Sequence, residues 1–140
     1  MGITIHKILD QKDQFAYAEL THGTERFKAH VWNEKEDLEK QIGIENLLVE
    51  LNYDRLLSLK LIEGFQDKDS YIRRIDQHYQ IRGRVIQIMK TETDTLIDIY
   101  LQTGPDFISI LQSQIGNLNL DKEQGVELEI TELKFFPSHY

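Results

Sequence analysis

Apolar and polar residues alternate at every second position through most of this 140-residue chain, and this alternation limits the fold more than any other feature. A period of two is that of a β-strand, because successive side chains of a strand point to opposite faces. The alternating runs are residues 3–9, 14–32, 47–61, 79–90, 96–111 and 126–135. We therefore expect a mainly β protein. In residues 47–61 the density of leucine leaves a helix open as an alternative.

Glycine residues divide some of these runs into hairpins. Gly23 lies between the two strands expected within residues 14–32, and Gly104 lies between residues 96–101 and 107–111. Glycine adopts the backbone conformations that tight turns require. The sequence therefore predicts two β-hairpins.

One charged segment has the pattern of a short helix. Asn33 precedes the acidic and basic residues 34–40, and Gly43 follows them. Asparagine is a favoured N-cap, acidic residues stabilise the first turn, and glycine commonly ends a helix. We expect one or two short helices in the fold, one of them here.

The alternation changes phase within two of the expected strands. In residues 79–90 the apolar face changes near Val85, beside Gly83, and in residues 126–135 it changes near Thr131. A single extra residue in a strand, or a sharp bend, moves the following side chains to the other face. We expect a bulge or bend at both places.

The polar stretch after residue 63 divides the chain into an N-terminal β-rich half, residues 1–63, a connector, residues 64–78, and a C-terminal half, residues 79–140. Each half contains a hairpin centred on glycine and a Val-Glu-Leu strand, Val49-Glu50-Leu51 and Val126-Glu127-Leu128. A tandem duplication of a five-stranded unit would explain the likeness. Chance similarity among short alternating strands would explain it as well.

The C-terminal half also has a bent first strand through Gly83-Arg84-Val85, a hairpin through Gly104, and Leu118-Asn119-Leu120 leading by Gly125 into the next strand. In these motifs residues 79–136 resemble the small oligonucleotide/oligosaccharide-binding (OB) barrels, particularly the transport-associated and molybdate-binding versions. The resemblance implies one or two small OB-like β-barrels. The Ser/Thr-Arg-Asn element of the oxyanion-binding members is absent before Gly83, so the resemblance concerns the fold.

Charge is unevenly distributed along the chain. The formal net charge is -8, yet residues 71–90 carry a net charge of +4 and the rest of the chain carries -12. Arginines and aromatic residues on a barrel strand can hold phosphates and stack on bases. The candidate binding residues of this basic segment are Arg73, Arg74, Tyr79, Arg82 and Arg84. The alternative is that these arginines pair with the protein's own surplus carboxylates.

The sequence lacks the usual signs of catalysis and metal binding. It contains no cysteine, no glycine-rich phosphate loop and no nucleophile elbow, and no two of its five histidines have the helical spacing of a metal site. Glu127 and Glu129 share a strand face, which we expect to be a solvated outer face rather than an acid/base pair. We expect a protein that is not an enzyme and has no cofactor and no metal.

These observations favour a non-enzymatic, acidic, cytoplasmic module that recognises a protein partner, as inhibitors and toxin-immunity proteins do. The alternative is an OB-like binder of single-stranded nucleic acid or a small anion through residues 73–84. The segment 1–6 has no secretion signal, and no apolar run approaches a membrane span, so we expect no membrane association. The sequence is compatible with a homo-oligomer.

Overall fold

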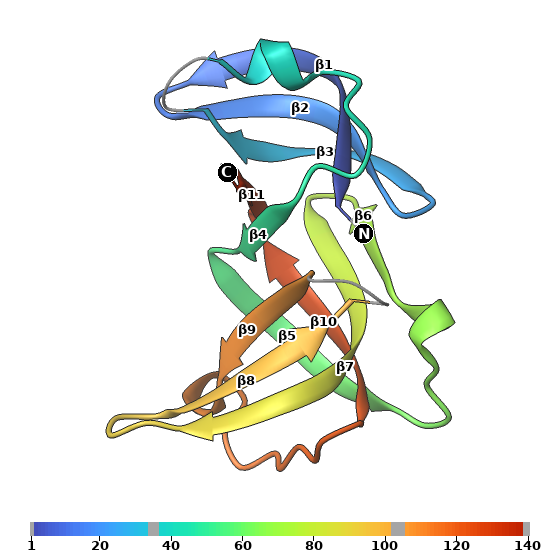
Figure 1. The fold of residues 1–140 in the computed structure, drawn as a ribbon. Coiled ribbons are helices and arrows are strands. Elements are labelled where there is room, and N and C mark those ends of the chain that lie inside the picture. The colour runs from blue at the N-terminus through green and yellow to red at the C-terminus, as the bar shows by residue number, and fades with distance from the viewer. Residues whose placement is uncertain (1, 34–36, 102–105, 139–140) are drawn as a thin grey trace.

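The computed structural model describes residues 2–33, 37–101 and 106–138. In these residues eleven strands and three short 3₁₀ helices are found, and no α-helix (Figure 1). The elements in chain order are β1 (Ile3–Lys12), β2 (Phe15–His22), β3 (Glu25–Trp32), η1 (Leu38–Gln41), β4 (Val49–Asn52), β5 (Arg55–Ile62), η2 (Asp67–Asp69), β6 (Tyr71–Ile75), β7 (His78–Lys90), β8 (Thr95–Tyr100), β9 (Phe107–Leu111), η3 (Gln112–Gln114), β10 (Gly125–Thr131) and β11 (Lys134–Pro137). The prediction of a mainly β protein is confirmed.

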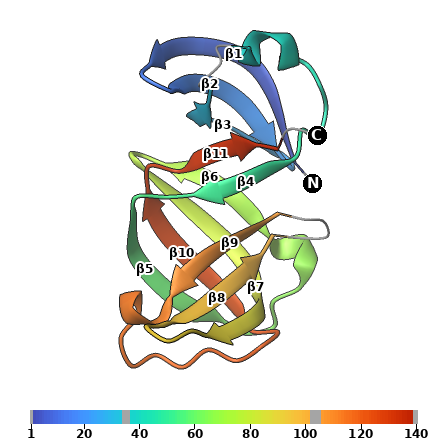
Figure 2. The ribbon, with the colours of Figure 1, turned by 60° about the vertical axis from the view of Figure 1, so that its left-hand side comes forward.

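The strands form two sheets, one above the other in Figure 1. The first sheet has the order β1-β2-β3-β11-β4, and the second has the order β5-β10-β7-β8-β9, with β6 paired to β7. Two nearly continuous stretches, β4 followed by β5 and β10 followed by β11, run from one sheet into the other (Figure 2). The sheets are therefore tied together by two crossings of the chain.

Each predicted half contributes one strand to the other half's sheet. Strand β11, from the C-terminal half, pairs in parallel with β3 and antiparallel with β4. Strand β5, from the N-terminal half, pairs with β10 in the second sheet. The expected connector, residues 64–78, holds η2 and the whole of β6, which pairs with β7. Exchange of this kind depends on contacts far apart in the sequence, which local alternation does not encode.

The described strands do not form a closed barrel by hydrogen bonding between neighbouring strands. In the first sheet the outer edges meet at one isolated bridge, where the amide of Ile3 donates to the carbonyl of Leu47 at 3.0 Å and the amide of Leu47 donates to the carbonyl of Ile3 at 2.8 Å. The second sheet has β5 and β9 as its edges.

Most of the expected elements are present. Strands β2 and β3 form the first hairpin, and β8 and β9 form the second, although Gly104 lies outside the described residues. The expected bulge is confirmed by a register shift between Val85 and Gln87, and β10 ends at Thr131, where the phase changes. A Cβ on Gly83 would lie 2.5 Å from the carbonyl oxygen of Tyr100, so only glycine fits there.

Two helical predictions are corrected. The helix expected after Asn33 is reduced to the four-residue 3₁₀ helix η1; the side-chain oxygen of Asn33 accepts from the amide of Leu38 at 3.0 Å, and residues 34–36 lie outside the described part. The helical alternative for residues 47–61 is wrong, because β4 and β5 occupy that segment. Each of these edge strands pairs along one side, β4 with β11 and β5 with β10, and this pairing outweighs the helix propensity of leucine.

The core follows from the alternation. Every second residue of β2 is buried, and the inward Ala16 and Ala18 oppose the inward Val31 and Ala29 of β3. Phe135 of β11 is fully buried and packs against Phe27 and the ring of His22. His22 also bonds Asp106 through its Nε2 at 3.0 Å, and this buried contact joins the first sheet to the start of β9 in the second.

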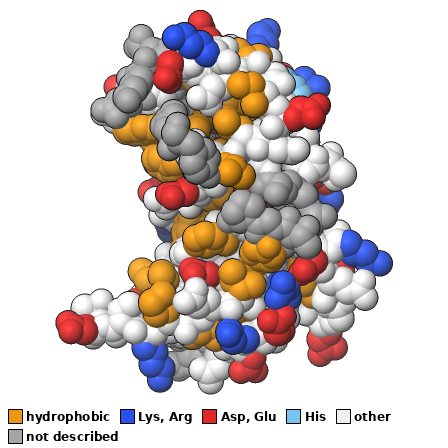
Figure 3. Space-filling model, viewed as in Figure 1, with side chains coloured by type: hydrophobic (Ala, Val, Ile, Leu, Met, Phe, Trp, Pro, Cys, Tyr) orange, Lys and Arg blue, Asp and Glu red, His pale blue; other side chains and the backbone are white. Residues whose placement is uncertain are grey.

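The outside of the molecule is not uniformly polar. Figure 3 shows hydrophobic side chains gathered in a band that passes from the upper sheet to the lower one, with charged side chains mostly around it. None of the helices in the described residues is long and apolar enough to span a membrane.

Candidate binding surfaces

Arg82 belongs to a row of charged side chains across the second sheet. Glu127 on β10 lies opposite Lys60 on β5 and opposite Arg82 on β7. Its carboxylate accepts from Nε of Arg82 at 2.8 Å and lies 2.9 Å from Nζ of Lys60. We call Lys60, Glu127 and Arg82 the ion-pair ladder.

The ladder corrects the expectation for Glu127. Its side chain is only 6% exposed, so it does not lie on a solvated face. Burial by itself would raise the pKa of Glu127, but the hydrogen bonds from Lys60 and Arg82 outweigh burial and lower it. The carboxylate is therefore ionised at neutral pH and partnered by two cations.

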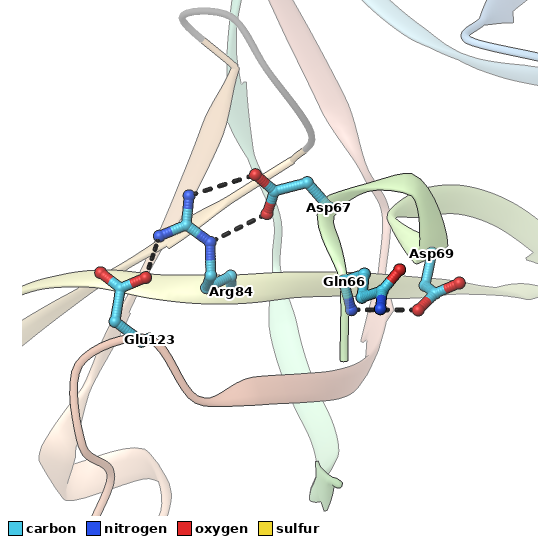
Figure 4. Close-up of polar contacts among 5 residues, drawn as sticks. All are labelled: Gln66, Asp67, Asp69, Arg84 and Glu123. Carbon is cyan, nitrogen blue, oxygen red and sulfur yellow. Dashed lines mark hydrogen bonds and ion pairs between the residues drawn. The ribbon is translucent and has the colours of Figure 1, made fainter. Parts of the chain in front are cut away.

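Arg84 is held by two carboxylates. Figure 4 shows its guanidinium between Asp67 of η2 and Glu123, which precedes β10. Nε donates to Asp67 at 2.8 Å and Nη1 donates to Glu123 at 2.6 Å. The side chains of Asp69 and Gln66 cap η2 and so hold Asp67 in place.

Arg73 is likewise paired. Its Nη2 donates to Glu25 of β3 at 2.7 Å, and its guanidinium lies 4.1 Å from the centre of the Tyr71 ring. Arg82 approaches the same ring at 5.2 Å. The structure thus brings Arg73 and Arg82 together around Tyr71, with a carboxylate on each arginine.

Arg74 and Tyr79, the other two candidates, have different surroundings. Nη1 of Arg74 donates to the hydroxyl of Tyr17 and to the carbonyl of Lys28, and Nε donates to the carbonyl of Asp76. The hydroxyl of Tyr79 donates to the same Lys28 carbonyl at 2.7 Å, and burial raises the pKa of Tyr79 to about 12. Among the described residues Arg74 has no carboxylate within ion-pairing distance, unlike the other three arginines.

Arg74 lines a cavity of about 330 Å³, formed where β1, β2 and β3 of the first sheet meet β6 and β7 of the second. The lining, which we call the Arg74 cavity, combines aromatic rings with charges of both signs: Asp10, Lys12, Phe15, Tyr17, His30, Arg74, Gln77, Tyr79 and Glu132. The pKa of His30 is lowered, first by burial and then by the nearby cations Lys134 and Arg74, against the opposing effect of Glu132. His30 is therefore neutral at pH 7.

An aromatic surface adjoins this cavity on the outward side of β2, β3 and β11. We call it the outer aromatic face, and its residues are Phe15, Tyr17, His30, Trp32 and Phe136, all half-buried. Phe15 lies opposite Trp32, and Tyr17 lies opposite His30. The ring of Phe15 makes edge contacts with Trp32 at 5.1 Å and with Phe136 at 5.8 Å between centroids.

The sequence analysis missed this face. One feature of the sequence does indicate it: the alanines at 16 and 18 alternate with the large rings at 15 and 17. The larger side chains therefore lie on the face of the strand that points away from the core. Alternation alone assigns the more apolar phase to the interior. Only the register that places Trp32 and Phe136 beside Phe15 reveals a continuous aromatic surface.

In the described part of the chain no three His, Cys, Asp or Glu side chains gather as metal ligands would. Comparison with protein-family models, with curated proteins and with solved structures found no match to this chain. The resemblance of residues 79–136 to OB barrels stays a prediction.

Proposed function

We propose that this protein is a non-enzymatic recognition module that binds a protein partner through the outer aromatic face. The observation that carries the proposal is the group of five half-buried rings on one outward sheet surface. Aromatic residues and arginine are enriched in protein interfaces, where large rigid rings fill pockets of the partner. Such a surface has no role in the core, because the opposite side of the same strands is already filled by other apolar side chains, among them Ala16, Ala18 and Phe135.

The charge of the protein supports a partner with a basic surface. The chain carries a net charge of -8, which speeds association with a positively charged protein and opposes the polyphosphate backbone of a nucleic acid. Nζ of Lys134 lies 5.4 Å from the centre of the Phe15 ring, and the charged residues of the Arg74 cavity adjoin the face, so apolar rings and charges occur together, as they do in protein interfaces. We propose a basic protein surface that presents apolar side chains to the rings.

The test is affinity capture with a matched pair of variants. Phe15→Ser with Trp32→Ser removes two facing rings, and we expect loss of the captured protein. The control is Leu57→Ser with Leu61→Ser. It removes two exposed apolar side chains, 40% and 41% exposed, from β5 of the second sheet. The captured protein should be retained by the control and by the wild type after nuclease treatment.

The captured partner must also bind after purification. We expect its affinity for the wild type to decrease as salt increases, because the charges of the two proteins attract each other. Equal affinity for the Phe15→Ser, Trp32→Ser variant would contradict the proposal. So would loss of binding in the control variant with binding intact in the aromatic one.

The second candidate function is binding of single-stranded nucleic acid or a small anion through residues 73–84. The observation in its favour is the placement of Arg73 and Arg82 around Tyr71, a ring on which a base could stack. Against it, Glu25 and Glu127 already occupy these arginines. A labelled oligo(dT) titrated at low and high salt tests it: binding that is lost in Arg82→Ala, Arg84→Ala would support it, and no binding at low salt would exclude it.

We also propose that the protein consists of two OB-like units that arose by tandem duplication. In the first sheet we number β1, β2 and β3 as 1, 2 and 3, the Val-Glu-Leu strand β4 as 4, and the received strand β11 as 5. In the second sheet β7, β8 and β9 are 1, 2 and 3, the Val-Glu-Leu strand β10 is 4, and the received strand β5 is 5. The orders are then 1-2-3-5-4 and 3-2-1-4-5. Strands that are neighbours in one sheet are neighbours in the other, except that strands 1 and 4 are separated in the first sheet and strands 3 and 5 in the second. This common order supports two similar units that exchange their fifth strands.

A truncation tests the exchange. A chain that ends at Glu132 lacks β11, the fifth strand of the first unit. We expect the amide protons of β3 and β4 to lose their protection from hydrogen exchange, while β7 and β8 remain protected. Unchanged protection of β3 and β4 would contradict the exchange.

A further inference from the structure

Arg74 differs from the other three arginines of the basic segment in its hydrogen-bond partners. The chain has 24 acidic and 16 basic residues, so an arginine can readily be neutralised, and Arg73, Arg82 and Arg84 each are. Arg74 instead bonds only neutral oxygens, one hydroxyl and two carbonyls. Within the described residues no hydrogen bond is found for its Nη2, so one amino group of a fixed guanidinium is left to donate to a ligand.

The guanidinium is also held in place before any ligand binds. Its hydrogen bonds come from three elements, β2, β3 and the turn between β6 and β7, and it lies 5.8 Å and 5.7 Å from the ring centres of Tyr17 and Tyr79. An arginine fixed in this way loses little conformational entropy when it binds an anion. A carboxylate is a natural partner for the remaining Nη2 group, because a hydrogen bond between two charged groups is stronger than one between neutral groups.

The other lining residues restrict the ligand further. The rings of Phe15, Tyr17 and His30 offer flat apolar surface, on which an aromatic group can stack. The cations Lys12 and Arg74 are balanced in the lining by the carboxylates of Asp10 and Glu132, and Nζ of Lys134, 4.0 Å from Glu132, adds one positive charge beside the cavity. It therefore suits one negative charge better than two. A volume of about 330 Å³ is in the range of small-molecule sites.

We propose that the Arg74 cavity binds a small aromatic monocarboxylate, with the carboxylate on the guanidinium of Arg74 and the ring against Phe15, Tyr17 and His30. Binding in this cavity does not require the proposed protein partner. Because both sites use the same three rings, such a ligand and a protein on the outer aromatic face would compete.

The test is a titration of the full-length, ¹⁵N-labelled protein followed by NMR, with three probes. They are 3-phenylpropionate, its neutral amide, and butyrate, which lacks the ring. We expect 3-phenylpropionate to shift the signals of the cavity residues with a dissociation constant of about 1 mM or tighter, as for other ligands of this size. The amide and butyrate should each bind at least about tenfold more weakly.

Two variants should change the affinity for 3-phenylpropionate in opposite directions. Arg74→Met should weaken 3-phenylpropionate binding by about tenfold or more, because the charge-assisted hydrogen bonds are lost. Glu132→Gln should strengthen it, because a carboxylate that repels the ligand is removed while Arg74 and its bonds are kept. Glu132→Gln does not rely on Arg74→Met remaining folded.

Several outcomes would overturn the proposal. They are no shift of the cavity signals at 10 mM 3-phenylpropionate, equal binding of the acid and its amide, equal binding to folded Arg74→Met, and weaker binding to Glu132→Gln. Phenyl phosphate, a dianion with the same ring, tests how many negative charges the cavity accepts. If it binds more tightly than 3-phenylpropionate, the cavity is not a site for one negative charge.

Discussion

The outward surfaces of the two sheets are built from the same alternating pattern but differ in chemistry. On the first sheet, facing residues such as Phe15 and Trp32 place ring against ring. On the second sheet, facing residues such as Glu127 and Arg82 place opposite charges against each other. The first surface keeps its apolar area partly exposed, whereas the second satisfies its charges internally.

The comparison teaches where a binding function can lie in this protein. A charge already paired with a neighbour has little attraction left for a ligand, and breaking the pair has a cost of its own. An exposed ring has its outer side free for a partner. Three of the four arginines of the basic segment are therefore paired within the protein, and recognition through the aromatic surface, with Arg74 beside it, stays our proposal.

The largest expected effect distinguishes the two sides of the first sheet. Phe135 and Phe136 are adjacent in β11, the first fully buried and the second on the outer aromatic face. Phe135→Ala should reduce the free energy of unfolding by about 3–5 kcal/mol, because it leaves a cavity in the core. Phe136→Ala should cost about 1 kcal/mol, the value of exposed ring contacts. Urea denaturation measures both, and equal losses would mean that the outer rings are structural.

The next effect concerns the second sheet. Glu127→Ala leaves Lys60 and Arg82 without their shared carboxylate, and we expect a loss of about 2 kcal/mol in the free energy of unfolding. The loss stays below that of a fully buried pair, because the side chain of Lys60 is 68% exposed and can be solvated. Chemical denaturation with Glu129→Ala as the control measures it. If Glu127→Ala lowers the free energy of unfolding by less than Phe136→Ala does, the ion-pair ladder contributes less to stability than the outer aromatic face.

A smaller effect should appear in acid. The folded protein lowers the pKa of Glu127 from its ordinary value of 4.5, so the unfolded chain takes up this proton first as the pH falls. The stability contributed by Glu127 is complete above about pH 4.5 and is lost as the pH falls through the lowered pKa. Glu127→Gln should therefore show a shallower loss of stability below pH 4.5 than the wild type. Parallel pH profiles would argue against ionic stabilisation by the ladder.

The smallest effect is expected on the first sheet, at a higher pH. The pKa of His30 is lowered from 6.5, mainly by burial, so the unfolded chain again binds the proton first. Stability is complete above about pH 6.5 and decreases as the pH falls through the lowered pKa. We expect His30→Gln to remove this decrease, in thermal unfolding followed between pH 7.5 and 5. A decrease that persists unchanged in His30→Gln would assign it to another group.

Much of the fold could be predicted from the sequence. The strands, both hairpins and the bulge near Val85 follow from local alternation and turn residues, which act within a few positions. The exchange of β5 and β11 could not be predicted, because pairing between residues as far apart as Ile62 and Gly125, or His30 and Lys134, leaves no local pattern. Of the helix expected after Asn33, the described residues show the 3₁₀ helix η1, whose N-cap is Asp37; the side chain of Asn33 instead bonds Gln11 of β1 and the amide of Leu38.

The candidate site was predicted only in part. The sequence identified all four arginines of the basic segment, and the structure separates Arg74 from the others by its partners. Glu127 was expected in solvent, because its position in the strand does not reveal that β5 and β7 would cover it from both sides. The cavity itself joins residues from β1, β2, β3, β6 and β7, a combination that no segment of the sequence contains.

By itself, the sequence determined which segments become strands and which residues carry charge, because side-chain direction in a strand repeats every two residues. Register and strand exchange, which only the tertiary structure decided, selected the neighbours of each side chain. Those neighbours determine whether a charge is neutralised, as at Arg82, or left open, as at Arg74. Electrostatic interactions depend on distance in space, and distance in space is not contained in local sequence.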